Sequence, residues 1–402
     1  MQVGWDWASQ AHDVTVMDDD GRIVDRFELT HDEAGLEDAI GRLAGHGEPK
    51  DLPVAIETNS GVVVDRLLDA GHPVVPIHPN SFNAARARWG ASGAKSDPGD
   101  SYRLADYLRT DGHRLRRLSK LDPATAELRA LVRMRDDHVA AKVAAMGQLG
   151  ALLDRNWPGG KAIFARLDSD IALDFLTDYP TPHSAAHLGE ARMAMFMKRH
   201  GYCGHRTAGQ LLARLRSAPE VAGGLSPEIL AELVAAQVQL LRSLLATIRH
   251  LDRSIHSAIA AHPKSDVLRA LPRVGTINLA QVIAEVGPIM ERAATVEQAC
   301  AEAGAAPVTR SSGKGRAVTF RWAANTQARY ALGIFADNSR HASPWAASLY
   351  ANARARGKRH PAAIRILMRA WLRVIWACWQ SDTPYDARLH GAEQRVKEPL
   401  VA

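Results

Sequence analysis

The N-terminal stretch Gln2-Val3-Gly4-Trp5-Asp6-Trp7-Ala8 decides the fold of the first part of this chain. It is a β-type run with a carboxylate in its middle, although aspartate is depleted in strands. Further β-type and helical runs follow it in alternation through the first hundred residues. They lie at residues 12–17, 22–27, 31–43, 52–57, 60 onward and 72–77.

The order of these runs indicates the class of fold. Three antiparallel strands come first, the last two joined by the turn Asp18-Asp19-Asp20-Gly21, and alternating helices and strands follow. This order predicts an α/β domain of the ribonuclease-H type. Asp97-Pro98-Gly99-Asp100 then opens a helix to about Arg109, because proline suits the first helical position and aspartate the cap before it. We expect this domain to span residues 1–115.

The middle of the chain, residues 116–262, is predicted to be helical. Apolar residues recur every three or four positions over 123–154 and again over 227–261. Two such long helices are expected to pair as an antiparallel coiled coil. Residues 157–224 between them are rich in Gly, Pro and His and are interpreted as a smaller helical insertion.

The last third, residues 263–402, is predicted to be mainly helical, so that the whole chain is α/β plus α. Leu271-Pro272-Arg273-Val274-Gly275-Thr276 precedes an apolar helix at 277–286 and has the form of a helix-hairpin-helix element. Its glycine turn and the following helix N-terminus suit a phosphate, although a plain loop between packed helices explains the pattern equally well. Ser311-Ser312-Gly313-Lys314-Gly315-Arg316 is interpreted as a basic, flexible loop.

The composition narrows the classes of function. The chain has 402 residues and a formal net charge of +6, with a pI of about 9.3, which favours an anionic polymer as partner. Its three cysteines are far apart, so neither a disulfide framework nor a structural zinc site is expected. We find no apolar leader and no run of about 18 apolar residues. A cytoplasmic, nucleoid-associated protein without a membrane is therefore expected.

Four carboxylates stand out as candidate metal ligands. Asp6 lies in the first strand, Glu57 ends an apolar strand, and Asp97 and Asp100 are three residues apart at a helix start. Strand ends are where open α/β sheets place ligands, and residues three apart on a helix reach a common point. Each also has a structural alternative: a surface charge on an edge strand, a solvated strand end, or a helix cap.

Convergence of the four would require cations. Two carboxylates about 4 Å apart repel by roughly 4 kcal/mol at an effective dielectric constant near 20. Mg²⁺ accepts such oxygen ligands and leaves positions for phosphate oxygens and water. Two ions about 4 Å apart stabilise both the attacking and the leaving oxygen of a phosphodiester displacement, which is nuclease or strand-transfer chemistry.

Five motifs, in order, resemble one family. Gly4-Trp5-Asp6, Ile56-Glu57-Thr58-Asn59-Ser60-Gly61 and Lys95-Ser96-Asp97-Pro98-Gly99-Asp100 resemble the DEDD motif of the insertion-sequence one-ten family of transposases. Leu271-Pro272-Arg273-Val274-Gly275, and Gly304-Ala305-Ala306-Pro307 through Ser312-Gly313, are similar to its C-terminal blocks. The likeness spans nearly the whole chain except the middle insertion.

The resemblance implies a RuvC-like catalytic domain, a coiled-coil linker and a C-terminal transposase domain. It implies recombination of donor and target double-stranded DNA, guided by a structured bridge RNA, in a homo-oligomer from dimer to tetramer. By the same likeness Asp6, Glu57, Asp97 and Asp100 bind Mg²⁺, and Ser312 is the nucleophile that forms a phosphoserine link to DNA. Ser311 beside it leaves the choice of serine open.

Basic and aromatic residues of the C-terminal third have two interpretations each. The Ser311–Ser312 loop is otherwise a phosphate-contacting loop. Basic residues could follow phosphates or form ordinary solvated helix faces. They are Arg114, Arg116, Arg117, Arg354, Arg356, Lys358, Arg359, Arg365, Arg369 and Arg373, the first three around the end of the N-terminal domain and the other seven on or between helices expected at 344–356 and 361–379. Trp371, Trp376 and Trp379 are expected in the core rather than on a base-stacking platform.

Two other functions fit less of the sequence. A metal-dependent junction endonuclease would hydrolyse phosphodiesters without a covalent intermediate and would leave the serine loop without a role. A nucleic-acid-binding protein without catalysis would make all four carboxylates structural.

Overall fold

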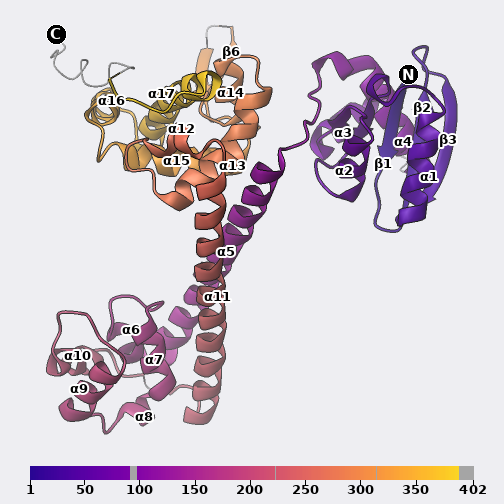
Figure 1. The fold of residues 1–402 in the computed structure, drawn as a ribbon. Coiled ribbons are helices and arrows are strands. Elements are labelled where there is room, and N and C mark those ends of the chain that lie inside the picture. Colours follow the sequence, from indigo (N-terminus) through magenta and orange to yellow (C-terminus); the bar gives the residue numbers. More distant parts are fainter. Residues whose placement is uncertain (91–96, 222, 314, 389–402) are drawn as a thin grey trace. The chain divides into compact units, whose positions relative to one another are not determined.

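The chain divides by its internal contacts into two units, Met1–Leu121 and Asp122–Ala402. The computed structural model describes residues 1–90, 97–221, 223–313 and 315–388, without the side chains of Asp97, Pro98 and Arg316. Figure 1 shows the fold of each unit.

A five-stranded mixed sheet forms the first unit, in the order β3-β2-β1-β4-β5. β1 pairs antiparallel with β2, β2 antiparallel with β3, and β1, β4 and β5 run parallel. The strands are β1 (Gln2–Asp6), β2 (Ala11–Met17), β3 (Ile23–Thr30), β4 (Val54–Ile56) and β5 (Val74–Pro76). The helices are α1 (Glu33–Ala44), α2 (Val62–Asp69), α3 (Pro79–Ala85) and α4 (Asp97–Asp111). The expected mixed α/β sheet region is therefore present, with β1, β4 and β5 shorter and β2 and β3 longer than the sequence predicts.

Alternation along β1 divides its side chains between the two faces of the sheet. Val3 and Trp5 are fully buried in a core that also contains Leu36 and Leu43 of α1 and Leu67 of α2. Gly4 and Asp6 lie on the other face, which α4 covers. The hydrophobic part of that second core is small and includes Ala55, Phe82, Leu104 and Leu108.

Gly4 is the point where α4 meets the sheet. A Cβ atom on Gly4 would lie 1.9 Å from the Ser101 carbonyl oxygen and 2.4 Å from the Ala105 nitrogen, both main-chain atoms of α4. The Ser101 hydroxyl also lies 2.8 Å from the Thr15 hydroxyl of β2 in a buried hydrogen bond. Only glycine at position 4 permits this approach, and it holds the first turns of α4 over β1 and β2.

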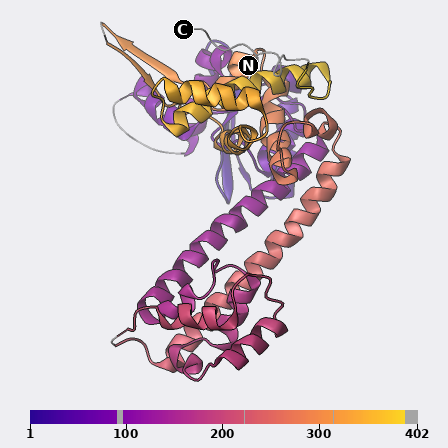
Figure 2. The same ribbon diagram turned by 90° about the vertical axis from the view of Figure 1, so that its left-hand side faces the viewer.

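Two long helices, α5 (Pro123–Asn156) and α11 (Pro227–Ala261), pair to form what we call the arm of the second unit (Figure 2). Both expected helices are thus present, and the predicted bounds of the second agree with the structure. Short helices pack against one end of the arm: α6 (Pro158–Ala162), α7 (Asp170–Asp178), α8 (Pro182–Ala185), α9 (Glu190–Arg199) and α10 (Ala208–Arg216). The helical insertion therefore shares a core with this end of the arm, and that core includes Trp157, Phe175 and Phe196.

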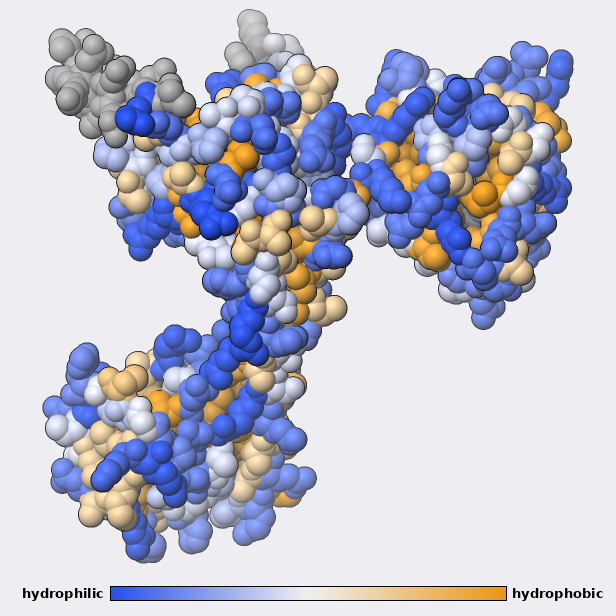
Figure 3. Space-filling model, viewed as in Figure 1, coloured by the Kyte–Doolittle hydropathy of each residue, from blue (hydrophilic) through white to orange (hydrophobic). Residues whose placement is uncertain are grey.

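The α11 helix bears on the statement, made from the sequence, that no run of about 18 apolar residues occurs. By length and composition alone it is long and apolar enough to cross a membrane, with 22% of its most apolar window buried. Its buried residues nevertheless belong to two protein cores, Val234 and Val238 in one and Ile255 and Ile259 in the other. Apolar side chains reach the surface along the arm (Figure 3), but the helix pairs with α5 as a core helix of the second unit.

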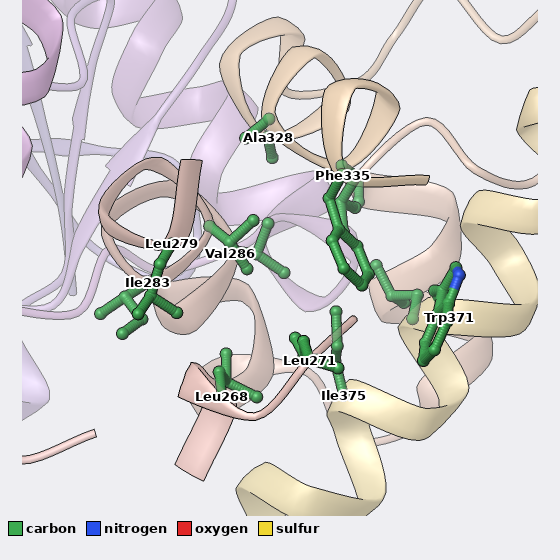
Figure 4. Packing of buried hydrophobic residues seen from close by; sticks show 14 of the residues in the cluster. Leu268, Leu271, Leu279, Ile283, Val286, Ala328, Phe335, Trp371 and Ile375 are labelled. Carbon is green, nitrogen blue, oxygen red and sulfur yellow. The ribbon is translucent and has the colours of Figure 1, made fainter. Parts of the chain in front are cut away.

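The other end of the arm carries a helical domain built around α13 (Thr276–Arg292), whose residues 278–290 are all buried. Val286 of this helix, Phe335 and Trp371 belong to one buried cluster, part of which Figure 4 shows. Gly287 allows close packing, since a Cβ there would lie 2.7 Å from the Trp379 ring. The surrounding helices are α12 (Ser265–Arg269), α14 (Val296–Glu302), α15 (Thr326–Ser339), α16 (Pro344–Ala355) and α17 (His360–Ser381).

The structure differs from two predictions about this domain. The segment expected to be a flexible loop at 311–316 belongs to an antiparallel hairpin, β6 (Val308–Ser312) and β7 (Gly315–Thr319), which extends from the helices (Figure 2). In the 271–276 turn, the left-handed residue is Arg273 with φ 57°, whereas Gly275 is the extended N-cap of α13. The glycine is therefore not needed there for its conformational freedom.

The Gly4 contact generates a test of the fold. We predict that Gly4→Ala lowers the free energy of unfolding by about 1–3 kcal/mol or more, because the added methyl group must displace helix backbone. Hydrogen–deuterium exchange of β1 and α4 peptides would measure this as lost protection. Gly41→Ala is the matched control: nothing lies within 4 Å of a Cβ there, so it should leave protection equal or greater. Equal protection in Gly4→Ala would contradict the close packing.

Candidate active site

Acidic side chains form a row across one face of the first sheet. The register pairs Asp6 of β1 with Asp13 of β2, and Asp13 with Glu28 of β3. On the other side, Trp5 pairs with Ile56 in β4, so Glu57, the next residue, comes beside Asp6. Asp6, Asp13 and Glu57 thus stand at one end of neighbouring strands.

Helix α4 adds Asp100 to this row. A cavity of about 220 Å³, which we call the carboxylate cavity, is lined by Asp6, Trp7, Ala8, Ala11, Asp13, Glu57 and Asp100. The Gly4 contact lies one turn of α4 beyond Asp100, and it explains why a helix residue reaches a strand end here. Three of the four predicted ligands therefore line one cavity. The side chain of Asp97, at the start of α4, lies outside the described residues.

Arginines hold the Asp100 carboxylate, whose side chain is 4% exposed. Its Oδ2 accepts a hydrogen bond from Arg86 Nη2 at 2.6 Å, and its Oδ1 accepts one from Arg103 Nη1 at 2.6 Å. Arg86 also donates to Asn83 and lies over the Phe82 ring, 4.9 Å from its centroid. Each carboxylate oxygen of Asp100 is thus paired with a guanidinium of the chain itself.

The carboxylate oxygens of the cavity suit a divalent cation if Asp100 exchanges one of its partners. Carboxylate oxygens from β1, β4 and α4 are the ligands that Mg²⁺ prefers. Within the described residues, however, no three acidic, histidine or cysteine side chains approach closely enough to hold a metal ion. The Asp100 oxygens lie instead against Arg86 and Arg103. A metal ion shared by the four predicted carboxylates would require Asp100 to exchange at least one guanidinium for the ion.

A buried histidine holds the segment that follows β1. His12 of β2 is 1% exposed, and its Nδ1 accepts a hydrogen bond from the Ala8 amide at 3.4 Å. Its Nε2 lies 2.8 Å from His31 Nδ1. Burial, together with the charge of His31, lowers the pKa of His12 to about 4. The ring is therefore neutral at physiological pH, as the acceptor role of Nδ1 requires, and it fixes the backbone beside the carboxylate cavity.

The two candidate serines lie in the second unit, at the end of β6. Ser312 pairs with Gly315 beside the turn at Gly313, whose φ is 54°. Both serines are exposed, and alternation along β6 places Ser312 on the face of Arg310 and Ser311 on the opposite face.

The predicted tryptophan positions are confirmed: Trp371 and Trp379 are buried, and Trp376 is half-buried against the same core. Among the basic residues, Arg373 pairs with Glu297 on α14. The Arg369 Nε is a buried donor for which the described residues provide no acceptor. Arg354, Arg356, Lys358 and Arg359 are exposed at the end of α16 and the start of α17.

Comparison with known proteins identifies the family of this chain. A family model for DEDD transposases of IS110 elements matches residues 3–158, and one described as the IS116/IS110/IS902 transposase family matches residues 265–351. The putative transposase of the IS117 mini-circle of Streptomyces coelicolor is 32% identical, over 99% of this chain and 97% of its own length. This chain belongs to the IS110 family of transposases.

Two other relatives are similar to this chain over most of its length. A 42 kDa protein of the insertion element IS900 of Mycobacterium paratuberculosis is 27% identical over 95% of this chain and 96% of its own length. A 43.6 kDa protein of IS110 from Streptomyces coelicolor is 28% identical over 74% and 73%, respectively. Such enzymes cut and rejoin DNA, and the DEDD domain implies a divalent metal.

The sequence analysis missed three residues of the carboxylate cavity and its surroundings. Asp13 and Glu28 could have been found from the antiparallel register, since Asp6 and Asp13 are cross-strand neighbours. No local pattern connects Arg86 with Asp100, because that contact depends on how the 79–89 segment folds over the sheet.

The Arg86 contact generates a prediction about metal affinity. We predict that Arg86→Gln tightens Mn²⁺ binding by at least tenfold, because a unit positive charge about 4 Å from a divalent ion costs roughly 2 kcal/mol even in water. Calorimetric titration of the transposase would measure it. Arg88→Gln is the matched control, since Arg88 pairs with Asp111 outside the cavity lining. Equal affinities in Arg86→Gln and wild type would show that Asp100 does not contact the ion.

Proposed function

We propose that this transposase cuts and rejoins the donor and target DNA of an insertion sequence with a Mg²⁺ centre in the carboxylate cavity and with Ser312 as nucleophile. The observation that supports the proposal is the meeting of Asp6, Glu57 and Asp100 around one cavity in a member of a DEDD family. Asp97, one turn before Asp100 on α4, is proposed as the fourth ligand.

The carboxylates would hold the ion while leaving coordination positions for substrate. A bound Mg²⁺ supplies a Lewis acid that stabilises charge on phosphate oxygens and lowers the pKa of a hydroxyl group. Asp6 and Glu57, at neighbouring strand ends, keep the ligand oxygens on a rigid sheet. Asp100, released from Arg86, would complete the set, and the freed guanidinium could then pair with a DNA phosphate.

Ser312 is preferred to Ser311 because of the side-chain alternation in β6. Arg310 and Ser312 share a face of the hairpin, so the guanidinium of Arg310 can hold the phosphate that the Ser312 hydroxyl attacks. In the step that we propose, Ser312 Oγ forms a bond to phosphorus, the bond from phosphorus to one strand oxygen breaks, and that strand leaves as a hydroxyl. The serine proton passes to a base, and attack by the incoming strand hydroxyl reverses the step.

The proposal includes the partners implied by the family likeness. A structured bridge RNA would select the donor and target sequences, and a homo-oligomer from dimer to tetramer would hold both duplexes. The exposed basic residues at 354–359 are candidates for phosphate contacts. The cytoplasm, beside the nucleoid, is the expected compartment.

The proposed chemistry predicts a covalent protein–DNA adduct. The protein is incubated with the junction DNA of its element, the candidate flanking RNA and Mg²⁺, and the products are separated on denaturing gels. We predict an adduct in wild type and in Ser311→Ala, and none in Ser312→Ala or Asp6→Asn. Thermal melting of each variant provides the control for folding.

Two outcomes would contradict parts of this proposal. An adduct that is lost in Ser311→Ala and kept in Ser312→Ala would move the nucleophile by one residue. Cleaved DNA without an adduct in any variant would favour the metal-dependent junction endonuclease instead.

A further inference from the structure

Trp322, directly after the β6–β7 hairpin, is the most exposed of the large hydrophobic side chains that the structure describes, at 81%. Tryptophans elsewhere in this unit, such as Trp371 and Trp379, are buried. An indole left in water loses the stabilisation that burial provides, so its position calls for a partner.

The backbone around Trp322 is firmly held, so its exposure does not come from a loose loop. Arg321 Nε donates to the Ala306 carbonyl at 3.2 Å, and Arg329 Nη1 donates to the Arg321 carbonyl at 3.2 Å. The Asn325 amide donates to the Glu302 carbonyl at 2.8 Å.

Gly304 adds a packing contact from the Gly304–Pro307 motif. It has φ 69°, and a Cβ there would lie 3.1 Å from the Ala324 side chain. This motif therefore anchors both sides of a segment whose indole points away from the core. The Trp322 ring is presented by a fixed backbone.

Phe320 and two arginines build a platform beside the indole. The Phe320 and Trp322 rings meet edge to face, with centroids 5.0 Å apart. The guanidinium groups of Arg329 and Arg365 lie over the Phe320 ring, at 4.6 and 5.2 Å from its centroid. Arginines stacked on aromatic rings and an exposed indole next to them form a surface that combines positive charge with a π-face.

The charge of this surface is uncompensated. Four arginines, Arg310, Arg321, Arg329 and Arg365, lie on the hairpin or around the platform, and within the described residues none of them forms an ion pair with a carboxylate. A partner with both negative charge and flat apolar faces is a nucleic acid.

We propose that Trp322 is a base-stacking residue that receives an unpaired nucleobase next to the strand attached to the hairpin. The inference rests on the proposed function in taking nucleic acid as the partner of this unit and Ser312 as the point where a strand is attached. Val308 pairs with Thr319 at the hairpin base, and Ser312 at its end is four residue steps further along β6. At about 3.4 Å per residue this is roughly 14 Å, or about four base steps, so the stacked base lies in flanking sequence.

The test uses the full chain in EDTA, so that it does not depend on strand cleavage. Fluorescence anisotropy measures binding to labelled single strands of 20 thymidines or 20 uridines and to a 20-base-pair DNA duplex. We predict that Trp322→Ala weakens binding to at least one single strand about tenfold, while Trp322→Phe stays within a few-fold of wild type. The two single strands distinguish DNA from RNA as the source of the base.

Control variants separate stacking from charge and from folding. Met195→Ala, another exposed apolar residue at 64%, should bind as wild type does. Arg310→Ala should reduce the salt dependence of binding by about one counterion, whereas Trp322→Ala should leave it unchanged. Melting temperatures of the Trp322 variants should equal that of wild type, because the indole packs against little of the core.

Three results would overturn the proposal. They are wild-type affinity in Trp322→Ala for both single strands, an equal loss in Trp322→Phe and Trp322→Ala, and no binding of either strand by wild type. A smaller molecular mass of Trp322→Ala in light scattering would assign the indole to contact with a second copy of the chain instead. None of these results bears on the adduct assay, so a failure here is distinguishable from a failure of the proposed chemistry.

Discussion

The contact between Gly4 and the backbone of α4 is the constraint on which the candidate active site depends. Because position 4 has no side chain, the Ser101 carbonyl and the Ala105 amide lie directly against β1. A helix that close brings its first turn to the strand ends, where the sheet register has already aligned Asp6 with Asp13 and Glu57. Without the helix, the acidic row at these strand ends would be open to water. Carboxylates that share a cavity also need a counter-charge. The chain supplies one itself through Arg86 and Arg103, which pair with Asp100.

The second unit has a different kind of constraint, a buried charge cluster where the arm meets α13. Glu285 is 2% exposed and pairs with Arg129 and Arg133 of α5. Breaking such a buried pair leaves an uncompensated charge in the core and is strongly destabilising. These two ion pairs therefore join α5 of the arm to α13 of the helical domain and oppose bending at their junction.

The elements in which apolar residues recur with a clear periodicity could be predicted from the sequence. The three opening strands and the α11 helix emerge from alternation and from three- and four-residue spacing, because each buries one face. The end of the β6–β7 hairpin is predicted as a loop. β6 has one half-buried residue, Val308, and four exposed ones, so it shows no alternation between buried and exposed positions. Within the candidate site, Asp6, Glu57 and Asp100 were identified from local motifs and family likeness. Asp13 depends on strand register and Arg86 on a long-range fold, neither of which a local pattern contains, and the roles of Asp97 and Ser312 stay predictions.

The central claim is that β1, the end of β4 and the start of α4 share one divalent-metal centre. Iron-mediated cleavage tests it most directly: Fe²⁺ replaces Mg²⁺ in the full-length transposase, ascorbate and peroxide generate hydroxyl radicals at the ion, and mass spectrometry maps the backbone breaks. We predict breaks near residues 6–8, 57–60 and 97–101 in the same sample, all suppressed by excess Mg²⁺ and absent in Asp6→Asn. Breaks confined to one of these segments, or breaks that Mg²⁺ does not suppress, would contradict a shared centre.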